Sequence, residues 1–342
     1  MTPPDEDALQ SGIARLLAMQ GKNTGASAML QALAIDARLL APASELITRA
    51  ELAMALNALL FADLLERVPT AARQVAEVRA QGDRIVFDHG ALRTIDGPTG
   101  ALPRGHSAFA RLLEPLGYHV GGHYPLPRLG MTGRAYVHKD LPEGIPQFFV
   151  SELHVDQLPE EGQNAATRVF RESCDPVDLE DEDRLKHLAA DGVLPTEEAA
   201  ALLSTLVAAF DRRHPVPRLD DYEALLACSK EAAWIATEGN AFNHATTRVP
   251  DVEALAERLK EQGYPMKEAV EISANGRVRQ TAILADRVHR TFRLREGGTV
   301  EREVPGSFYE FITRDVDPET GTLDLSFDSG NATGIFAVTR SA

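Results

Sequence analysis

Hydrophobic positions along this 342-residue chain switch between helical spacing and strand-like alternation, and the switches divide the chain into four segments. Apolar residues three and four positions apart predict helices, whereas alternation predicts strands with one buried face. The expected segments are an N-terminal helical segment at 1–80, a first mixed unit of strands and a helix at 81–160, an inserted helical layer at 161–236, and a second mixed unit with a tail at 237–342.

The two mixed segments run through the same order of elements, in which a strand is followed by an amphipathic helix and then by further strands. In the first unit, strands are expected at 83–95, 133–139 and 146–155, with a helix at 106–120. In the second, strands are expected at 240–249, 278–294 and 306–316, with a helix at 251–264 capped by Asp251 and an irregular or strand-like tail at 324–341.

The helical segments have their own signals. Pro69 interrupts the helical spacing of the first segment. In the third segment, helices are expected at 195–213 and 219–236. They follow an acidic stretch at 175–183, which is expected to be a solvated connection.

A short motif occurs once in each mixed unit. The letters FDHGALR contain His89, and the letters FNHATTR contain His244 at the matching place. At similar distances after them come two aromatic strands with a glutamate, FFVSE ending in Glu152 and SFYEF with Glu310. A fold built from two copies of one unit can direct matching side chains into one central site. The repeat therefore predicts a metal centre.

The ligand types leave more than one metal open. Two histidines and one carboxylate with open positions are the ligand set of non-haem Fe(II) oxygen chemistry. A fourth ligand would suit a Zn, Ni or Co site that acts as a Lewis acid, and ligand type alone also admits Mn. Glu152 can supply that fourth ligand, or it can orient a histidine from behind.

Arg93 is the expected contact for an anionic substrate group. Residues two apart in a strand share a face, so Arg93 lies on the face of His89 with Cα atoms about 13 Å apart. Its guanidinium stays cationic and can hold a carboxylate through two hydrogen bonds. Arg248 has the matching place in the second unit, where a structural role is expected. The same alternation predicts an apolar wall beside the ligands, formed by Phe87, Phe242, Phe308 and Ile312.

Composition limits the partners. The formal net charge is −16, and no Lys/Arg cluster offsets it, so nucleic acid and anionic membranes are not expected to bind. The sequence contains no apolar stretch long enough for a membrane span, and its acidic first residues lead us to expect no signal peptide. Cys174 and Cys228 form no C-x-x-C motif, which favours a reducing compartment and a cytoplasmic location. The oligomeric state stays open.

The repeated units resemble the vicinal oxygen chelate superfamily, which includes the glyoxalases. More closely, FDHGALRT, FNHATTRV and GSFYEFITR are similar to the 2-oxoadipate dioxygenase/decarboxylase family, also called 2-hydroxyglutarate synthase. By this resemblance the metal ligands are His89, His244 and Glu310, and the arginine for the substrate carboxylate is Arg93. The resemblance implies an α+β fold, in which two βαβββ units form a partly open, glyoxalase-like barrel flanked by the N-terminal and inserted helical layers.

The same resemblance implies an activity. Family members bind Fe(II), and their partners are a small-molecule 2-oxo acid and O2, which they use to decarboxylate the acid oxidatively and to hydroxylate the shortened product. From 2-oxoadipate the products are 2-hydroxyglutarate and CO2, a step in bacterial lysine breakdown. Two alternatives remain: a glyoxalase-type isomerase or lyase with Glu152 as fourth ligand and general base, and a non-catalytic binder of small molecules on the same scaffold.

Overall fold

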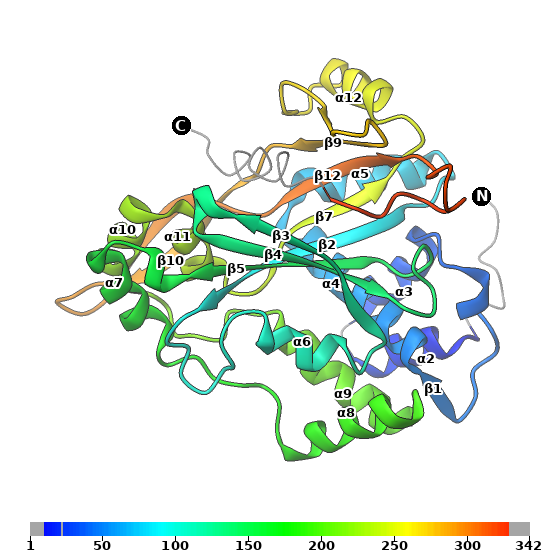
Figure 1. Ribbon diagram of the computed structural model, residues 1–342, viewed down its shortest axis with the longest axis horizontal. Coiled ribbons are helices and arrows are strands. Elements are labelled where there is room, and N and C mark those ends of the chain that lie inside the picture. Colours follow the sequence, from blue (N-terminus) through cyan, green and yellow to red (C-terminus); the bar gives the residue numbers. More distant parts are fainter. Residues whose placement is uncertain (1–9, 22, 328–342) are drawn as a thin grey trace.

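The computed structural model describes residues 10–21 and 23–327, and a strongly curved eight-stranded sheet lies at its centre (Figure 1). The strand order is β3-β4-β5-β2-β7-β12-β9-β8. The strands are β2 (Val86–Asp96), β3 (Tyr118–Leu126), β4 (Met131–His138), β5 (Gln147–His154), β7 (Phe242–Arg248), β8 (Glu271–Ile272), β9 (Val278–Ile283) and β12 (Phe308–Arg314). With helices on its faces, this sheet confirms the predicted α+β class.

The sheet consists of two copies of one unit, joined side by side. In the first copy β2 is followed by α6 (Ser107–Leu113) and then by β3, β4 and β5; in the second, β7 is followed by α12 (Val252–Glu261) and then by β8, β9 and β12. Within each copy the first strand pairs in parallel with the last, and the remaining pairs are antiparallel. An antiparallel pairing of β2 with β7 joins the copies. The predicted pair of βαβββ units in a partly open barrel is confirmed.

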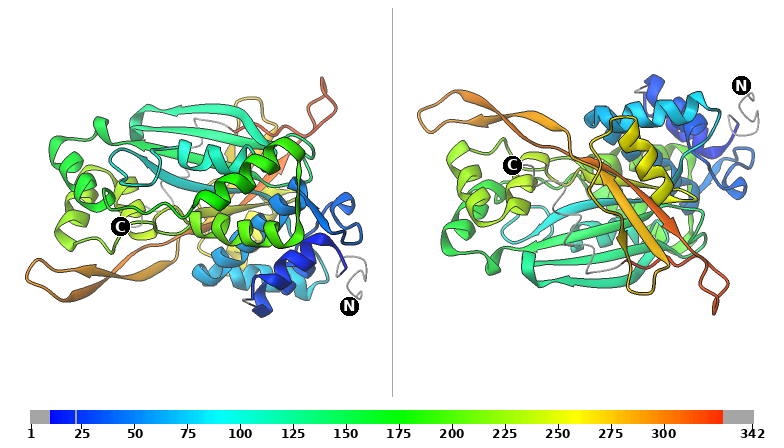
Figure 2. Two further views of the ribbon diagram at one scale, coloured as in Figure 1. Left: turned by 90° about the horizontal axis from the view of Figure 1, so that it is seen from below. Right: turned by 90° about the horizontal axis from the view of Figure 1, so that it is seen from above.

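The second unit differs from the first by an inserted hairpin. β10 (Arg287–Arg293) and β11 (Thr299–Pro305) pair antiparallel between β9 and β12 in the sequence and form a separate ribbon. Figure 2 shows this hairpin extending beyond the sheet beside helices α10 (Leu219–Cys228) and α11 (Lys230–Glu238). The sequence pattern missed β11 and merged β9 with β10. A second two-stranded pair is formed by β1 (Leu46–Thr48) and β6 (Val193–Pro195).

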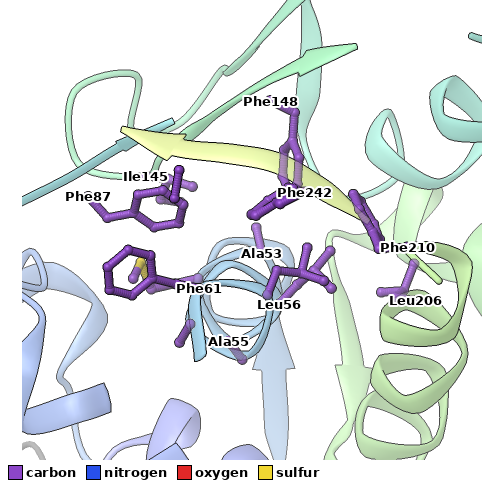
Figure 3. Packing of buried hydrophobic residues seen from close by; sticks show 14 of the residues in the cluster. Ala53, Ala55, Leu56, Phe61, Phe87, Ile145, Phe148, Leu206, Phe210 and Phe242 are labelled. Atoms are coloured by element: carbon purple, nitrogen blue, oxygen red, sulfur yellow. The ribbon is translucent and has the colours of Figure 1, made fainter. Parts of the chain in front are cut away.

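The N-terminal helices cover one face of the sheet and build the main core. They are α2 (Gly12–Met19), α3 (Asn23–Ala32), α4 (Arg49–Arg67) and α5 (Pro69–Ala80). Figure 3 shows α4 beneath the sheet, with its Phe61 facing Phe87 of β2 at a ring-centre distance of 4.9 Å. Phe242 of β7 and Phe148 of β5 continue this aromatic layer, with ring centres 5.9 Å apart. As predicted, the first long helix ends before Pro69.

The inserted helical layer differs from the sequence-based prediction in two places. Its helices are α7 (Glu160–Phe170), α8 (Leu179–Asp191), α9 (Thr196–Ala209), α10 and α11. The acidic stretch 175–183 is not only a connection, because α8 begins within it and Asp178 caps that helix by accepting from the backbone N–H of Asp181 at 2.9 Å. The expected helix at 219–236 is two helices, because Ser229 is extended and caps α11 through the backbone N–H of Ala232 at 3.2 Å.

The helix that follows β2 is shorter than predicted, whereas the cap of α12 is as predicted. The helix expected at 106–120 ends at Leu113, and Tyr118 already begins β3 after Gly117, whose φ is 94°. Asp251 caps α12 as predicted, accepting from the backbone N–H of Ala254 at 2.9 Å. Most of the tail expected at 324–341 lies outside the described residues. Within 10–21 and 23–327, no helix has both the length and the apolarity needed to cross a membrane.

Candidate metal centre

His89, His244 and Glu310 meet where the two units join, on the three adjacent strands β2, β7 and β12. Each side chain offers one ligand atom, and these atoms all lie within 4.8 Å of one another. The Nε2 atoms of His89 and His244 are 3.8 and 3.6 Å from the same carboxylate oxygen, Oε2 of Glu310. All three side chains are buried, and they form the one group of this kind in the part of the chain that the structure describes.

The strand register explains why the three side chains converge. Thr246 on β7 is the cross-strand neighbour of His89 on one side and of Glu310 on the other. Residues opposite each other across a sheet share a face and lie within side-chain reach. The Thr246 hydroxyl donates to Glu310 Oε2 at 2.7 Å and lies 3.0 Å from His89 Nε2. Thr246, which the sequence reading did not single out, therefore aligns a ligand from each unit.

Each ligand histidine follows an irregularity in its strand. The register between β2 and β7 shifts between Phe87 and His89, and again opposite Asn243. A β-bulge adds one unpaired residue and changes which face the next side chains occupy. The added residues, Asp88 and Asn243, turn an oxygen toward the Nδ1 atom of the adjacent histidine, at 2.8 and 3.2 Å. Nε2 of each ring is then left for the shared site.

The electrostatics of the site suit a bound cation. Burial raises the pKa of Glu310 to about 8, and the hydrogen bond from Thr246 only partly opposes that shift. The other carboxylate oxygen, Oε1, is buried and has no hydrogen-bond partner among the described residues. Burial also lowers the pKa values of His89 and His244, which favours the neutral imidazole that binds metals. A divalent cation would restore the charge and the contact that the buried carboxylate lacks.

Asp88 is a buried carboxylate behind His89 that the sequence reading missed. Besides its contact with His89, it accepts from Arg248 Nε at 2.9 Å and from Arg314 Nη2 at 3.0 Å. Burial alone would raise the pKa of Asp88, but Arg314, His89 and Arg248 outweigh it and hold that pKa well below its usual range. The available signal was that the two motif copies have Asp88 and Asn243 at the same place, directly before the histidine.

Arg314 also holds the chain that follows β12 against the site. It donates to the backbone oxygens of Asp324 and Ser326, both at 2.8 Å. Its guanidinium carbon lies 5.1 Å from the ring centre of Phe327, within the range of a cation–π contact. The backbone N–H of Phe327 donates to the Tyr124 hydroxyl at 3.1 Å. One arginine therefore ties Asp88 to a segment that reaches the ligands.

Aromatic rings surround the ligand atoms. Phe327 packs edge-on against His89 at a ring-centre distance of 4.8 Å and contacts Phe149 at the same distance. Phe308 stacks on His244 at 4.7 Å. Low exposure and apolar neighbours limit access of water, which strengthens electrostatic interactions within the site.

The expected apolar wall is correct for Phe308 and wrong for Phe87 and Phe242. The bulges at Asp88 and Asn243 turn both of these phenylalanines away from the ligands and into the core beneath the sheet. Gly90 makes room for this packing, because a Cβ there would come within 2.1 Å of the Phe242 ring. Ile312, two residues beyond Glu310 on β12, is fully buried.

Arg93 lies four residues after His89 on β2 and is almost fully buried, with 1% of its surface exposed. Its guanidinium carbon is 5.0 Å from the ring centre of Trp234 on α11. Burial lowers the pKa of Arg93 to about 10, with Glu231 acting in the opposite direction, so the side chain is cationic at neutral pH. Its charge also acts on His244, adding to the effects of burial and of His89 in lowering the pKa of that imidazole. Arg93 is therefore a cation near the ligands.

Glu152 does not join the three ligand residues. It accepts from Arg134 Nη1 at 2.5 Å and from the backbone N–H of His106 at 2.9 Å. The strand pairing corrects the match with Glu310: Gln147 lies opposite His89 as Phe308 lies opposite His244, so Phe149 occupies the place of Glu310. A fourth-ligand role for Glu152 has no support in this geometry. Arg248, expected to be structural, pairs with Asp88.

The fold and the side-chain cluster together define a class of protein, one with a glyoxalase-like fold and a candidate metal centre between its two units. Residues 57–321 match the family model of 2-oxoadipate dioxygenase/decarboxylase. The chain belongs to this family of enzymes. It is 25% identical over 304 residues to the chloroplastic/amyloplastic 2-oxoadipate dioxygenase/decarboxylase of Oryza sativa subsp. japonica, a match that covers 80% of this chain and 75% of the rice protein.

Two solved structures share the fold. A Ralstonia eutropha JMP134 protein assigned to the glyoxalase superfamily is 50% identical, with a TM-score of 0.86 and coverage of 93% of this chain and 98% of the other. The hydroxyglutarate synthase of Oryza sativa, solved in complex with 2-oxoadipate, has a TM-score of 0.67 at 22% identity, covering 85% of this chain and 93% of that one. At 22% identity, the match to the rice enzyme shows that the two chains share a fold.

Proposed function

We propose that this protein is an Fe(II)-dependent dioxygenase that converts a 2-oxo acid, with 2-oxoadipate as the substrate, to 2-hydroxyglutarate and CO2. The observation that carries the proposal is the buried group of two histidines and one glutamate with an unpartnered Oε1. Membership in the 2-oxoadipate dioxygenase/decarboxylase family and the 2-oxoadipate bound in the rice structure support the choice of substrate.

The overall reaction balances without an external reductant. One molecule of 2-oxoadipate and one of O2 give one 2-hydroxyglutarate and one CO2. The C1–C2 bond breaks and C1 leaves as CO2. One oxygen atom completes the new carboxyl group, and the other becomes the hydroxyl. An electron donor is therefore not among the proposed partners, which are the 2-oxo acid and O2.

The residues of this chain have separate roles in the proposal. His89, His244 and Glu310 hold Fe(II), which supplies a place where O2 and the 2-oxo acid meet and react. Arg93 binds the carboxylate at the far end of the substrate, since a guanidinium can hold a carboxylate through two parallel hydrogen bonds. Phe308 and Phe327 exclude water around the ligands. Asp88 and Asn243 fix the orientation of the two imidazoles.

We also propose a place in lysine breakdown and a cytoplasmic location. The proposed substrate supports the place in lysine breakdown, because the family resemblance implies that conversion of 2-oxoadipate to 2-hydroxyglutarate is a step of that pathway. The two cysteines support the cytoplasmic location, since Cys174 and Cys228 are free thiols.

Oxygen uptake by reconstituted protein tests the proposal. Metal-free protein is loaded anaerobically with Fe(II), mixed with 2-oxoadipate and then exposed to air. We expect O2 uptake with equal release of CO2 and formation of 2-hydroxyglutarate, absent with Zn(II) and absent in His244→Ala. Glu152→Gln is the matched control, and we expect it to keep both metal content and O2 uptake. Turnover without O2 that is lost in Glu152→Gln would instead establish the glyoxalase-type alternative.

A further inference from the structure

Helix α11 presents Trp234 to Arg93. The ring centre of Trp234 lies 5.0 Å from the guanidinium carbon. Trp234 is 4% exposed, so its ring belongs to the interior beside Arg93. A cation over an aromatic face is attracted electrostatically by the π system.

Trp234 itself is fixed in place. Its indole Nε1 donates to the backbone oxygen of Gly306, in the short link between β11 and β12, at 3.1 Å. The buried ring therefore has a hydrogen bond at one edge and the guanidinium of Arg93 at its face. An aromatic side chain held in this way restricts the positions that a neighbouring guanidinium can take.

The helix that carries Trp234 is anchored at both ends. Ser229 caps its N-terminus through the backbone N–H of Ala232. At its C-terminus, Glu238 binds Arg290 of the inserted hairpin through two hydrogen bonds of 2.7 Å. The hairpin is an addition that the first unit lacks, and its ion pair holds α11 against Arg93.

We propose that Trp234 is a positioning residue that sets the Arg93 guanidinium for the distal carboxylate of the substrate. The protein thereby selects 2-oxo acids with a second carboxylate over those with an apolar end. This inference rests on the proposed function, because it needs Arg93 to be the substrate contact. It adds the group that positions this contact and so determines how strongly the contact discriminates.

Binding of two matched ligands tests the role of Trp234. 2-Oxoadipate and 2-oxohexanoate have the same six-carbon chain and differ in one terminal group, a carboxylate or a methyl. Their dissociation constants are measured by titrating anaerobic Fe(II)-loaded protein. In Trp234→Leu we expect the dissociation constant of 2-oxoadipate to rise about tenfold and that of 2-oxohexanoate to stay unchanged. In turnover, KM for 2-oxoadipate should rise with kcat unchanged.

Two further variants separate positioning from support of the fold. Trp234→Phe keeps an aromatic face and should retain most of the discrimination between the ligands. Tyr222→Leu removes a buried ring from the neighbouring helix α10, where it packs on Phe292, and should change neither ligand. Equal weakening of both ligands in Trp234→Leu, or loss of discrimination in Tyr222→Leu, would overturn the proposal.

If the wild type binds neither ligand, the proposed function fails; if it prefers 2-oxoadipate and Trp234→Leu keeps that preference, only the positioning role fails.

Discussion

Among the described residues, Asp88 makes more hydrogen bonds and ion pairs than any of the three candidate metal ligands, of which it contacts His89. It is fully buried and is bound by two arginines and by His89. Such a carboxylate stabilises the fold only while its partners are present, because each charge has been removed from water. Its loss would leave Arg314, whose side chain is fully buried, without its counter-charge.

We predict that Asp88→Asn lowers the free energy of unfolding by about 3–5 kcal/mol, the cost of leaving buried charges without their partner. Urea unfolding at pH 7 measures this change. Asp183→Asn is the control, because Asp183 is 70% exposed and forms a surface pair with Lys186, and we expect little change there. An equal effect in the two variants would contradict the view that Asp88 organises the interior.

At the scale of residues, the repeated motif is enough to single out His89 and His244, and the structure brings them together with Glu310. The groups that support them are harder to predict. Arg314 lies 226 residues from Asp88 in the sequence, and no local pattern connects the two. Glu152 was matched to Glu310 by counting residues to a glutamate, whereas the strand pairing puts Phe149 there.

At the scale of elements, β4 ends in a histidine that must stay neutral. His138 is fully buried; its Nε2 lies 2.9 Å from the backbone oxygen of Leu116, and its Nδ1 accepts from the backbone N–H of Asp140 at 3.2 Å. Both ring nitrogens are therefore occupied in the neutral form. Burial lowers the pKa of His138 to about 4, from an ordinary value of about 6.5.

Because His138 must stay neutral in the folded protein, we predict that the free energy of unfolding falls in mild acid. Between pH 6.5 and about 4 the unfolded chain binds a proton at His138 that the folded protein does not, so stability falls as pH falls, by about 1.4 kcal/mol per pH unit for one group. Replacing His138 by Asn should lower stability at pH 7 but flatten this slope. Urea unfolding at pH 5, 6 and 7 measures both. Equal slopes in wild type and variant between pH 5 and 7 would contradict the prediction. Above about pH 7.5, where His138 is neutral in both the folded and the unfolded chain, the two slopes should coincide.

The order and type of most elements follow from the sequence, because amphipathic spacing and caps such as Asp251 are local signals. The errors lie where a single residue overrides a periodic pattern. Ser229 divides one apolar stripe into α10 and α11. The bulges at Asp88 and Asn243 reverse the faces of Phe87 and Phe242. A bulge depends on pairing with a distant strand, so alternation within one strand cannot reveal it.

At the scale of the whole molecule, the two units have diverged around one site. The first supplies His89 and Arg93, and the second supplies His244 and Glu310. Phe149 fills the place in the first unit that Glu310 occupies in the second. One member of this matched pair is therefore a carboxylate and the other an apolar ring. As a result, the first unit contributes one of the three candidate ligands and the second contributes two.

A metal bound at this site would link the two units, since its ligands come from β2 on one side of the junction and from β7 and β12 on the other. Anything that binds only the folded state stabilises it, by about 2.7 kcal/mol at a concentration one hundred times the Kd. We therefore predict that Fe(II), added anaerobically, raises the thermal unfolding midpoint of metal-free protein by several degrees. His89→Ala and Glu310→Ala, which remove a ligand from opposite sides of the junction, should each abolish this rise, whereas Glu152→Gln should keep it. A rise that survives in either ligand variant would mean that the cation binds elsewhere. A rise lost in Glu152→Gln would mean that Glu152 takes part in holding the cation, contrary to its place in the strand register.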